Sequence, residues 1–212
     1  MRTLKTIGGI FLVLYSILIL FVEYRSGQEA VRYYLTDIQG PRPFYAINTS
    51  LSALFLALTS FAFLLSARCL VGDKFSEKRR VFYISQFLIF AYLAIDERFM
   101  FHEHMGSLIG INGDYTIISL GIVEAVIFFT LGKFMELPKQ NKLYLAFAAS
   151  FFLIMVINDR LIPATVFWRL SIEDLSKMWS GLFLCLFAWK TLLDHIDALR
   201  NRSKDTATQR LS

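Results

Sequence analysis

Long apolar runs separated by short polar segments recur along the whole chain. Runs of about 20 apolar residues are typical of helices that cross a bilayer, because a helix of that length spans the hydrocarbon core. The alternating pattern of an outer-membrane barrel is absent. The chain is therefore predicted to be an all-α, polytopic membrane protein. Its six transmembrane helices are expected at about residues 7–22, 47–70, 81–101, 115–134, 143–157 and 177–193.

The composition of the chain agrees with this class of protein, and the positions of its polar segments predict how the chain is organised. Of the 212 residues, 56% are hydrophobic, 18% are charged and 21 are phenylalanine, whereas a soluble domain carries more charge and less phenylalanine. We expect a single six-helix transmembrane domain over residues 1–200 and a polar cytoplasmic tail over residues 201–212. The polar loop over residues 23–46 contains Gly27 and has room for a short interfacial helix at about residues 28–35.

The positions of the basic residues predict the topology. If the N-terminus lies in the cytoplasm, fifteen of the 22 Lys and Arg residues fall in inner segments, as the positive-inside rule requires. Both termini are then cytoplasmic, and a bacterial inner membrane is the expected location. The net charge of +5 comes from these short basic blocks, so no nucleic-acid partner is expected.

The segment over residues 96–104, Asp-Glu-Arg-Phe-Met-Phe-His-Glu-His, is the main candidate for a functional site. It places six ionisable side chains and two of the three histidines at the outer end of the third predicted span. Carboxylates with one or two imidazoles suit iron, manganese or zinc held between helices. On a regular helix Asp96, Glu97, Glu103 and His104 share one arc, while His102 points away.

Glu124 is the second candidate, because it lies near the middle of the fourth predicted span. A carboxylate at that depth is costly unless it is protonated, paired or metal-bound, and such a residue marks a functional site by default. It could face the acidic segment from the next helix. The alternative is a protonated glutamate that donates a structural hydrogen bond to another helix.

Structural explanations remain open for the acidic segment too. Arg98 could pair with Asp96 or Glu97 at an interfacial helix end, with the histidines facing lipid headgroups. A relay for protons or a ligand without any metal is a further alternative, and the HExxH motif of zinc proteases is absent. Near the sixth span, residues 171–174 have the S-x-x-[DE] form of a capping box, so Glu173 is either a helix-dipole acid or a ligand.

The spacing Asp96-Glu97-x4-His102-Glu103 resembles a group of uncharacterised prokaryotic multi-pass membrane proteins with a D-E-x4-H-E motif at a helix end. In that group an acidic E-E-x-x-E-M motif opens a later span. Here residues 173–178, Glu-Asp-Leu-Ser-Lys-Met, take that place, with lysine replacing the third acid. The resemblance covers residues 90–185. It implies one site made of Asp96, Glu97, His102, Glu103 and Glu173, and it favours His102 over His104, against regular helix geometry.

A weaker resemblance is to the intramembrane ceramidase-like zinc hydrolases, which hold zinc with three histidines and use an aspartate and a serine. This chain also has three histidines, but His195 is predicted at the cytoplasmic side, on a solvated helix face. The three histidines are therefore not expected to form one zinc site.

Two functions follow from these observations. The first is a metal-dependent enzyme that acts on a lipid or lipid-linked substrate near the outer leaflet, with Glu103 and Glu124 as catalytic residues. Its metal, iron, manganese or zinc, would be held by Asp96, Glu97, His102, Glu103, His104 and Glu173. The alternative is a non-catalytic membrane subunit or small transporter, in which Glu124 and the acidic segment handle protons or a cation. Stoichiometric metal favours the enzyme, and metal-free protein that purifies with membrane protein partners favours the alternative.

Overall fold

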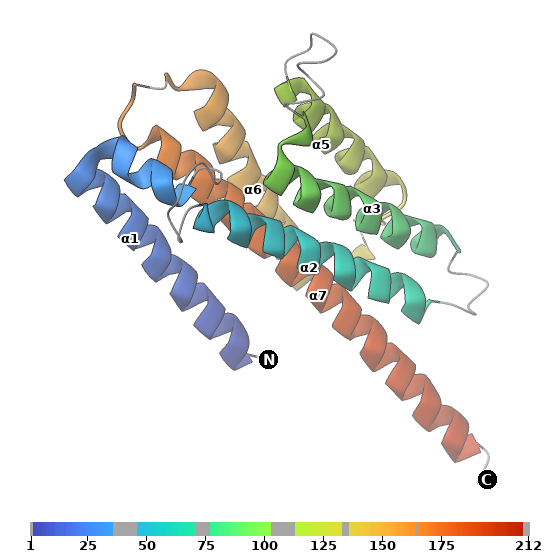
Figure 1. Ribbon diagram of the computed structural model, residues 1–212. Helices are drawn as coiled ribbons and strands as arrows, with labels where there is room; N and C mark the ends of the chain where they lie inside the picture. Colours follow the sequence, from blue (N-terminus) through green and yellow to red (C-terminus); the bar gives the residue numbers. More distant parts are fainter. Residues whose placement is uncertain are drawn as a thin grey trace. The chain divides into compact units, whose positions relative to one another are not determined.

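All secondary structure in the part of the chain that the structure describes is helical (Figure 1). The computed structural model describes residues 2–35, 46–70, 77–102, 113–132, 136–163 and 165–209. This confirms the all-α prediction. The helices are α1 (Arg2–Leu35), α2 (Ile47–Cys69), α3 (Glu77–Phe99), α5 (Gly113–Thr130), α6 (Lys139–Leu161) and α7 (Arg169–Gln209).

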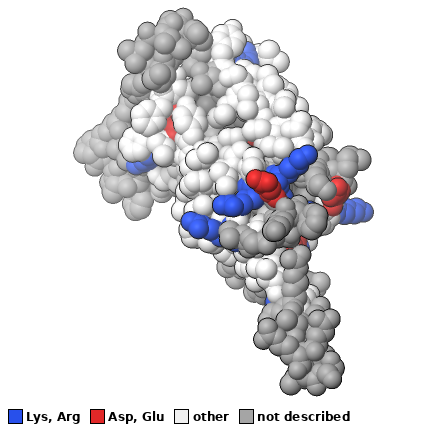
Figure 2. All heavy atoms as spheres, turned by 90° about the vertical axis from the view of Figure 1, so that its right-hand side faces the viewer, with Lys and Arg blue, Asp and Glu red and all other residues white. Residues whose placement is uncertain are grey.

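Three of the described helical segments are both long and apolar enough to cross a membrane, which indicates a membrane protein. They are Gly9–Arg32, Ile47–Cys69 and Lys139–Leu161. Six such helices were expected. The others are less apolar or shorter: α3 has charged residues in its first and last turns, and the apolar part of α5 covers only Ile118–Thr130. On the face drawn in Figure 2, most of the described surface is uncharged, and several Lys and Arg side chains lie together with Asp and Glu in one area.

The chain forms two compact units, which are described separately. The first unit contains Met1–Ser52 and Ala149–Ser180, and the second contains Ala53–Ala148 and Gly181–Ser212. Consequently α1 belongs to the first unit and α3 and α5 to the second, while α2, α6 and α7 contribute residues to both.

In the first unit, α1 bends at Gly27, as Figure 1 shows in blue. The backbone angles of Gly27 are φ 77° and ψ 173°, a conformation that residues with a Cβ atom rarely adopt. The helix resumes after this residue and continues to Leu35. The short helix for which the sequence has room at about residues 28–35 is therefore present, as a bent continuation of the first predicted span, and its interfacial position stays a prediction.

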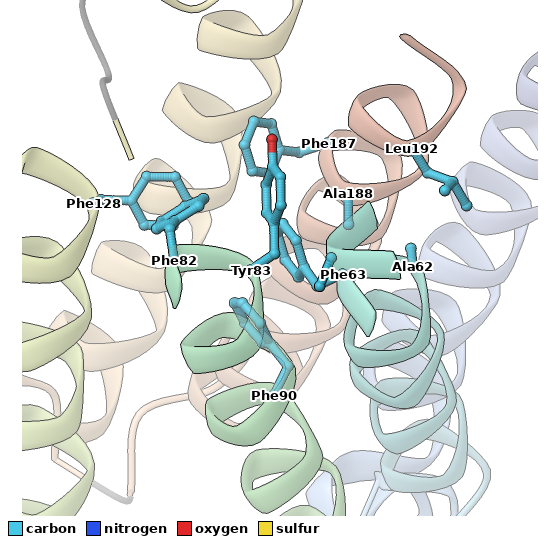
Figure 3. Packing of buried hydrophobic residues seen from close by; sticks show 10 residues of the cluster. Ala62, Phe63, Phe82, Tyr83, Phe90, Phe128, Phe187, Ala188 and Leu192 are labelled. Atoms are coloured by element: carbon cyan, nitrogen blue, oxygen red, sulfur yellow. The ribbon is translucent and has the colours of Figure 1, made fainter. Parts of the chain in front are cut away.

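The core of the second unit is an aromatic cluster (Figure 3). Phe63 of α2 is fully buried and stacks on Tyr83 and Phe90 of α3, with ring centroids 6.0 and 5.8 Å apart. Phe82 of α3 meets Phe128 of α5 edge to face at 5.2 Å. Such offset and edge-on contacts stabilise aromatic pairs beyond the area they bury. The cluster therefore fixes α3, which carries the buried polar residues Gln86 and Asp96, against α5.

Candidate functional site

The predicted acidic segment begins on α3 and continues past its end. The helix stops at Phe99, and Met100 adopts a left-handed conformation with φ 50°. Its backbone N–H still donates to the Asp96 carbonyl at 2.7 Å, which closes the last turn. The chain then turns away from the helix axis. The regular helix assumed for residues 96–104 is therefore interrupted, and His102 no longer points away from Asp96.

Asp96 and His102 form a close pair in the second unit. The backbone N–H of His102 donates to Asp96 Oδ1, and its ring Nδ1 contacts Asp96 Oδ2, both at 2.7 Å. Asp96 is only 3% exposed. A carboxylate that accepts from Nδ1–H fixes the tautomer in which Nε2 carries the lone pair; this assignment follows from the hydrogen-bond network. Histidines that bind metals or act as bases are oriented in this way.

The other predicted ligands of this segment are placed differently. Glu97 is partly buried on α3 and engaged in an interaction of its own. Glu103 and His104 lie outside the described residues. Within the described residues no group of three or more His, Cys, Asp or Glu side chains is arranged to hold a metal ion. Asp96 was predicted to be a metal ligand, and in the structure both of its carboxylate oxygens contact His102.

Glu124 lies on α5 in the second unit, where α5 contacts α3. Both of its carboxyl oxygens are buried, and the neighbouring polar side chain is Gln86 of α3, which is fully buried. Gln86 is close enough to interact with the carboxyl, but the geometry falls short of a regular hydrogen bond. The sequence analysis missed Gln86, although a single amide within an apolar run was a usable signal.

Glu173 lies in the first unit and belongs to an ion-pair network around Arg169. Arg169 Nη2 lies 3.4 Å from Glu173 Oε2 and 3.0 Å from Asp159 Oδ1. The Arg169 side chain also donates to the backbone carbonyls of Asn158, Asp159 and Ile162 at 2.9–3.2 Å. These carbonyls lie at the end of α6 and directly after it, where helices leave acceptors without an intrahelical partner. Arg169, which sequence reasoning missed, thus closes α6.

The predicted capping box at residues 171–174 is wrong. Helix α7 begins at Arg169, so Ser171 lies inside it, and its hydroxyl donates to the carboxylate of Glu23. Glu23 comes from α1, is fully buried, and also accepts the backbone N–H of Trp168 at 3.0 Å. A negative charge at the start of α7 is favourable because the N–H groups there have no helical acceptor. This role could not be predicted from the sequence, in which Glu23 directly follows an apolar run.

Comparison with known proteins yields one match. A family model described as "Domain of unknown function (DUF8692)" matches residues 6–191. This range includes Asp96, His102, Glu124 and Glu173. No curated protein and no solved structure matches the chain.

Proposed function

We propose that this chain, which belongs to the DUF8692 family of domains of unknown function, is a metal-dependent membrane enzyme. It crosses the bacterial inner membrane six times with both termini in the cytoplasm. It acts on a lipid or lipid-linked substrate near the outer leaflet. The metal is iron, manganese or zinc, bound beside the Asp96–His102 pair.

The observation that carries this proposal is the pair itself. Asp96 holds the His102 ring through Nδ1 at 2.7 Å, so that Nε2 is the nitrogen with a lone pair for a metal. Asp96 thereby acts as the orienting carboxylate. Glu97, Glu103 and His104 are the further ligands, and all lie within two residues of the pair along the chain.

The proposed chemistry follows from these ligand types. A bound transition metal lowers the pKa of a water molecule and polarises a carbonyl or phosphoryl oxygen of the substrate. Glu103, as the general base, takes the proton of the attacking water. Asp96 keeps the imidazole in one tautomer and one orientation throughout. Our proposal leaves Glu124 out of the catalytic set, because its carboxyl is buried beside Gln86.

The length and charge of α3 support its passage through the membrane. Its 23 residues rise about 34 Å along the axis, against a hydrocarbon core of about 30 Å. Lys78, Arg79 and Arg80 are exposed in its first turns, as expected for a cytoplasmic end. The Asp96–His102 pair then lies toward the outer leaflet.

The test is the metal content of detergent-purified protein after reconstitution with each of the three metals. We expect about one ion per chain in the wild type. His102→Gln should lose it, and Asp96→Asn should weaken the metal affinity about 10–100-fold. His195→Gln is the matched control, because that ring is also held by one hydrogen bond, to Tyr83, and should leave the metal content unchanged. A wild type that binds none of the three metals contradicts the proposal.

A further inference from the structure

Four of the buried polar atoms without a regular hydrogen bond in the described part of the second unit belong to two side chains: both carboxyl oxygens of Glu124, and the amide oxygen and nitrogen of Gln86. Their side chains lie next to each other, on α5 and α3 respectively. Buried polar groups are nearly always satisfied, because an unsatisfied one has lost its water and gained nothing in return. Four such atoms at one place therefore call for an explanation.

The surroundings of this pair are apolar. Phe128 follows Glu124 by one helical turn on α5, and Phe82 precedes Gln86 by one turn on α3. These two rings contact each other at 5.2 Å in the aromatic cluster (Figure 3). The Gln86 amide is the polar side chain next to the Glu124 carboxyl.

The chemistry of the two groups decides which form of Glu124 fits. A protonated carboxyl donates its O–H to the amide oxygen and accepts an amide N–H at its carbonyl oxygen, so that the two groups pair twice. An ionised carboxylate only accepts. It can accept the Gln86 N–H, but it offers no donor to the Gln86 oxygen, and its negative charge stays buried inside the membrane. The Glu124–Gln86 pair is thus complementary to the proton-bound state.

We propose that Glu124 is a proton-binding site in the membrane interior and that Gln86 is its hydrogen-bond partner. Uptake forms an O–H bond between the carboxylate and a proton donated by hydronium, with water as the product. Release reverses this step and breaks one of the two hydrogen bonds to Gln86. The membrane location of this site rests on the proposed six-span topology, but the site is separate from the metal chemistry proposed at Asp96 and His102, so the metal test and the labelling test can fail independently.

Carbodiimide labelling of the detergent-purified full-length chain tests the proposal. The O–H of a protonated carboxyl adds across a carbodiimide C=N bond to give an O-acylisourea, and in an apolar site the acyl group then migrates to nitrogen, which leaves a stable N-acylurea. An ionised carboxylate does not react. We expect an adduct on Glu124 at neutral pH, located by mass spectrometry, that declines as the pH rises. Glu29, whose side chain is 82% exposed, should remain unlabelled. Glu124→Gln should abolish the adduct at this position.

Added sodium distinguishes a bound proton from a bound metal cation at the Glu124 site. The carboxylate and the Gln86 oxygen offer the hard oxygen atoms that such a cation also binds. If added sodium at constant pH protects Glu124 from labelling, a cation occupies the site and the proton assignment is overturned.

Infrared spectroscopy provides a readout that does not depend on access of the reagent. The wild type should show the carbonyl stretch of a protonated carboxyl, and this band should be missing in Glu124→Gln. Gln86→Leu should shift the band, because the amide partner is lost, whereas Gln140→Leu on the exposed start of α6 should not move it. The absence of this band from the wild type overturns the proposal.

Discussion

His195 packs edge-on against Tyr83 in the second unit. The ring centroids are 5.3 Å apart, and His195 Nε2 lies 2.8 Å from the Tyr83 hydroxyl. The side chain is half-buried, although the sequence predicted a solvated helix face. Burial lowers the pKa of His195 below its ordinary value of 6.5; Arg79 of α3 lowers it further, and Asp194 of α7 opposes the shift.

This shift predicts how stability depends on pH. Above about pH 6.5 the imidazole is neutral in both the folded and the unfolded chain, and its contribution is fully present. As the pH falls below 6.5, the unfolded chain binds the proton first, so the free energy of unfolding decreases until the pH passes the folded pKa. Thermal unfolding measured between pH 8 and pH 5 should show a smaller loss for His195→Gln than for the wild type. An equal loss in both proteins would assign the pH dependence to other groups.

Other single residues redirect the backbone, and this changes which side chains meet. Met100 and Trp168 have φ angles of 50° and 72°, although neither is glycine. At Met100 the turn brings His102 back to Asp96, and at Trp168 it presents a backbone N–H to Glu23. Such angles are uncommon for bulky residues and persist where surrounding contacts hold them. Both occur at helix ends next to a buried carboxylate.

At the scale of elements, the bend in α1 depends on the conformation of Gly27 and not on the space around it. A Cβ atom at Gly27 would meet nothing within 4 Å, and the same is true at Gly9. Only Gly27 has a positive φ. Gly27→Ala should therefore lower the free energy of unfolding by about 1–3 kcal/mol, the cost of placing a Cβ in that region. Gly9→Ala should be neutral or stabilising, because alanine favours a helix.

Denaturant unfolding of both alanine variants in the same detergent measures this difference. Equal stability of the two variants would mean that α1 straightens at residue 27 without loss, and the bend would then have no energetic importance.

The bounds of the helices show how much of each element the sequence could predict. The apolar parts of α2 and α5 were placed to within a few residues, because apolar runs of that length mark a helix directly. The predicted spans at 143–157 and 177–193 are shorter than α6 and α7, which cover Lys139–Leu161 and Arg169–Gln209. A helix continues into polar residues because its backbone hydrogen bonds do not depend on apolar side chains.

For the whole molecule, the number of spans is open to a decisive test. Three described segments meet the length and hydropathy needed to cross a membrane, whereas six spans are proposed. Both topologies, starting from a cytoplasmic N-terminus, place residue 138 in the cytoplasm and residue 163 outside. They differ at the C-terminus, since an odd number of spans leaves it outside and an even number returns it to the cytoplasm.

Reporter fusions in a bacterial host distinguish these topologies. A fluorescent protein matures in the cytoplasm, and alkaline phosphatase is active only outside it. With six spans, a fluorescent protein fused after Ser212 should be bright and a phosphatase at the same position inactive. Fusions at residues 138 and 163 serve as inner and outer controls, because both topologies agree there. An active phosphatase at the C-terminus contradicts six spans.

The sequence by itself determined that the chain is helical and belongs in a membrane, because apolar runs and basic blocks are local properties. It also singled out Asp96, His102 and Glu124 as residues in unusual positions. It could not assign their partners. Gln86 reaches Glu124 because the aromatic cluster holds α3 against α5, and His102 reaches Asp96 because the helix breaks at Met100. Glu23 and Ser171 are 148 positions apart, so only tertiary folding could bring that carboxylate to the start of α7.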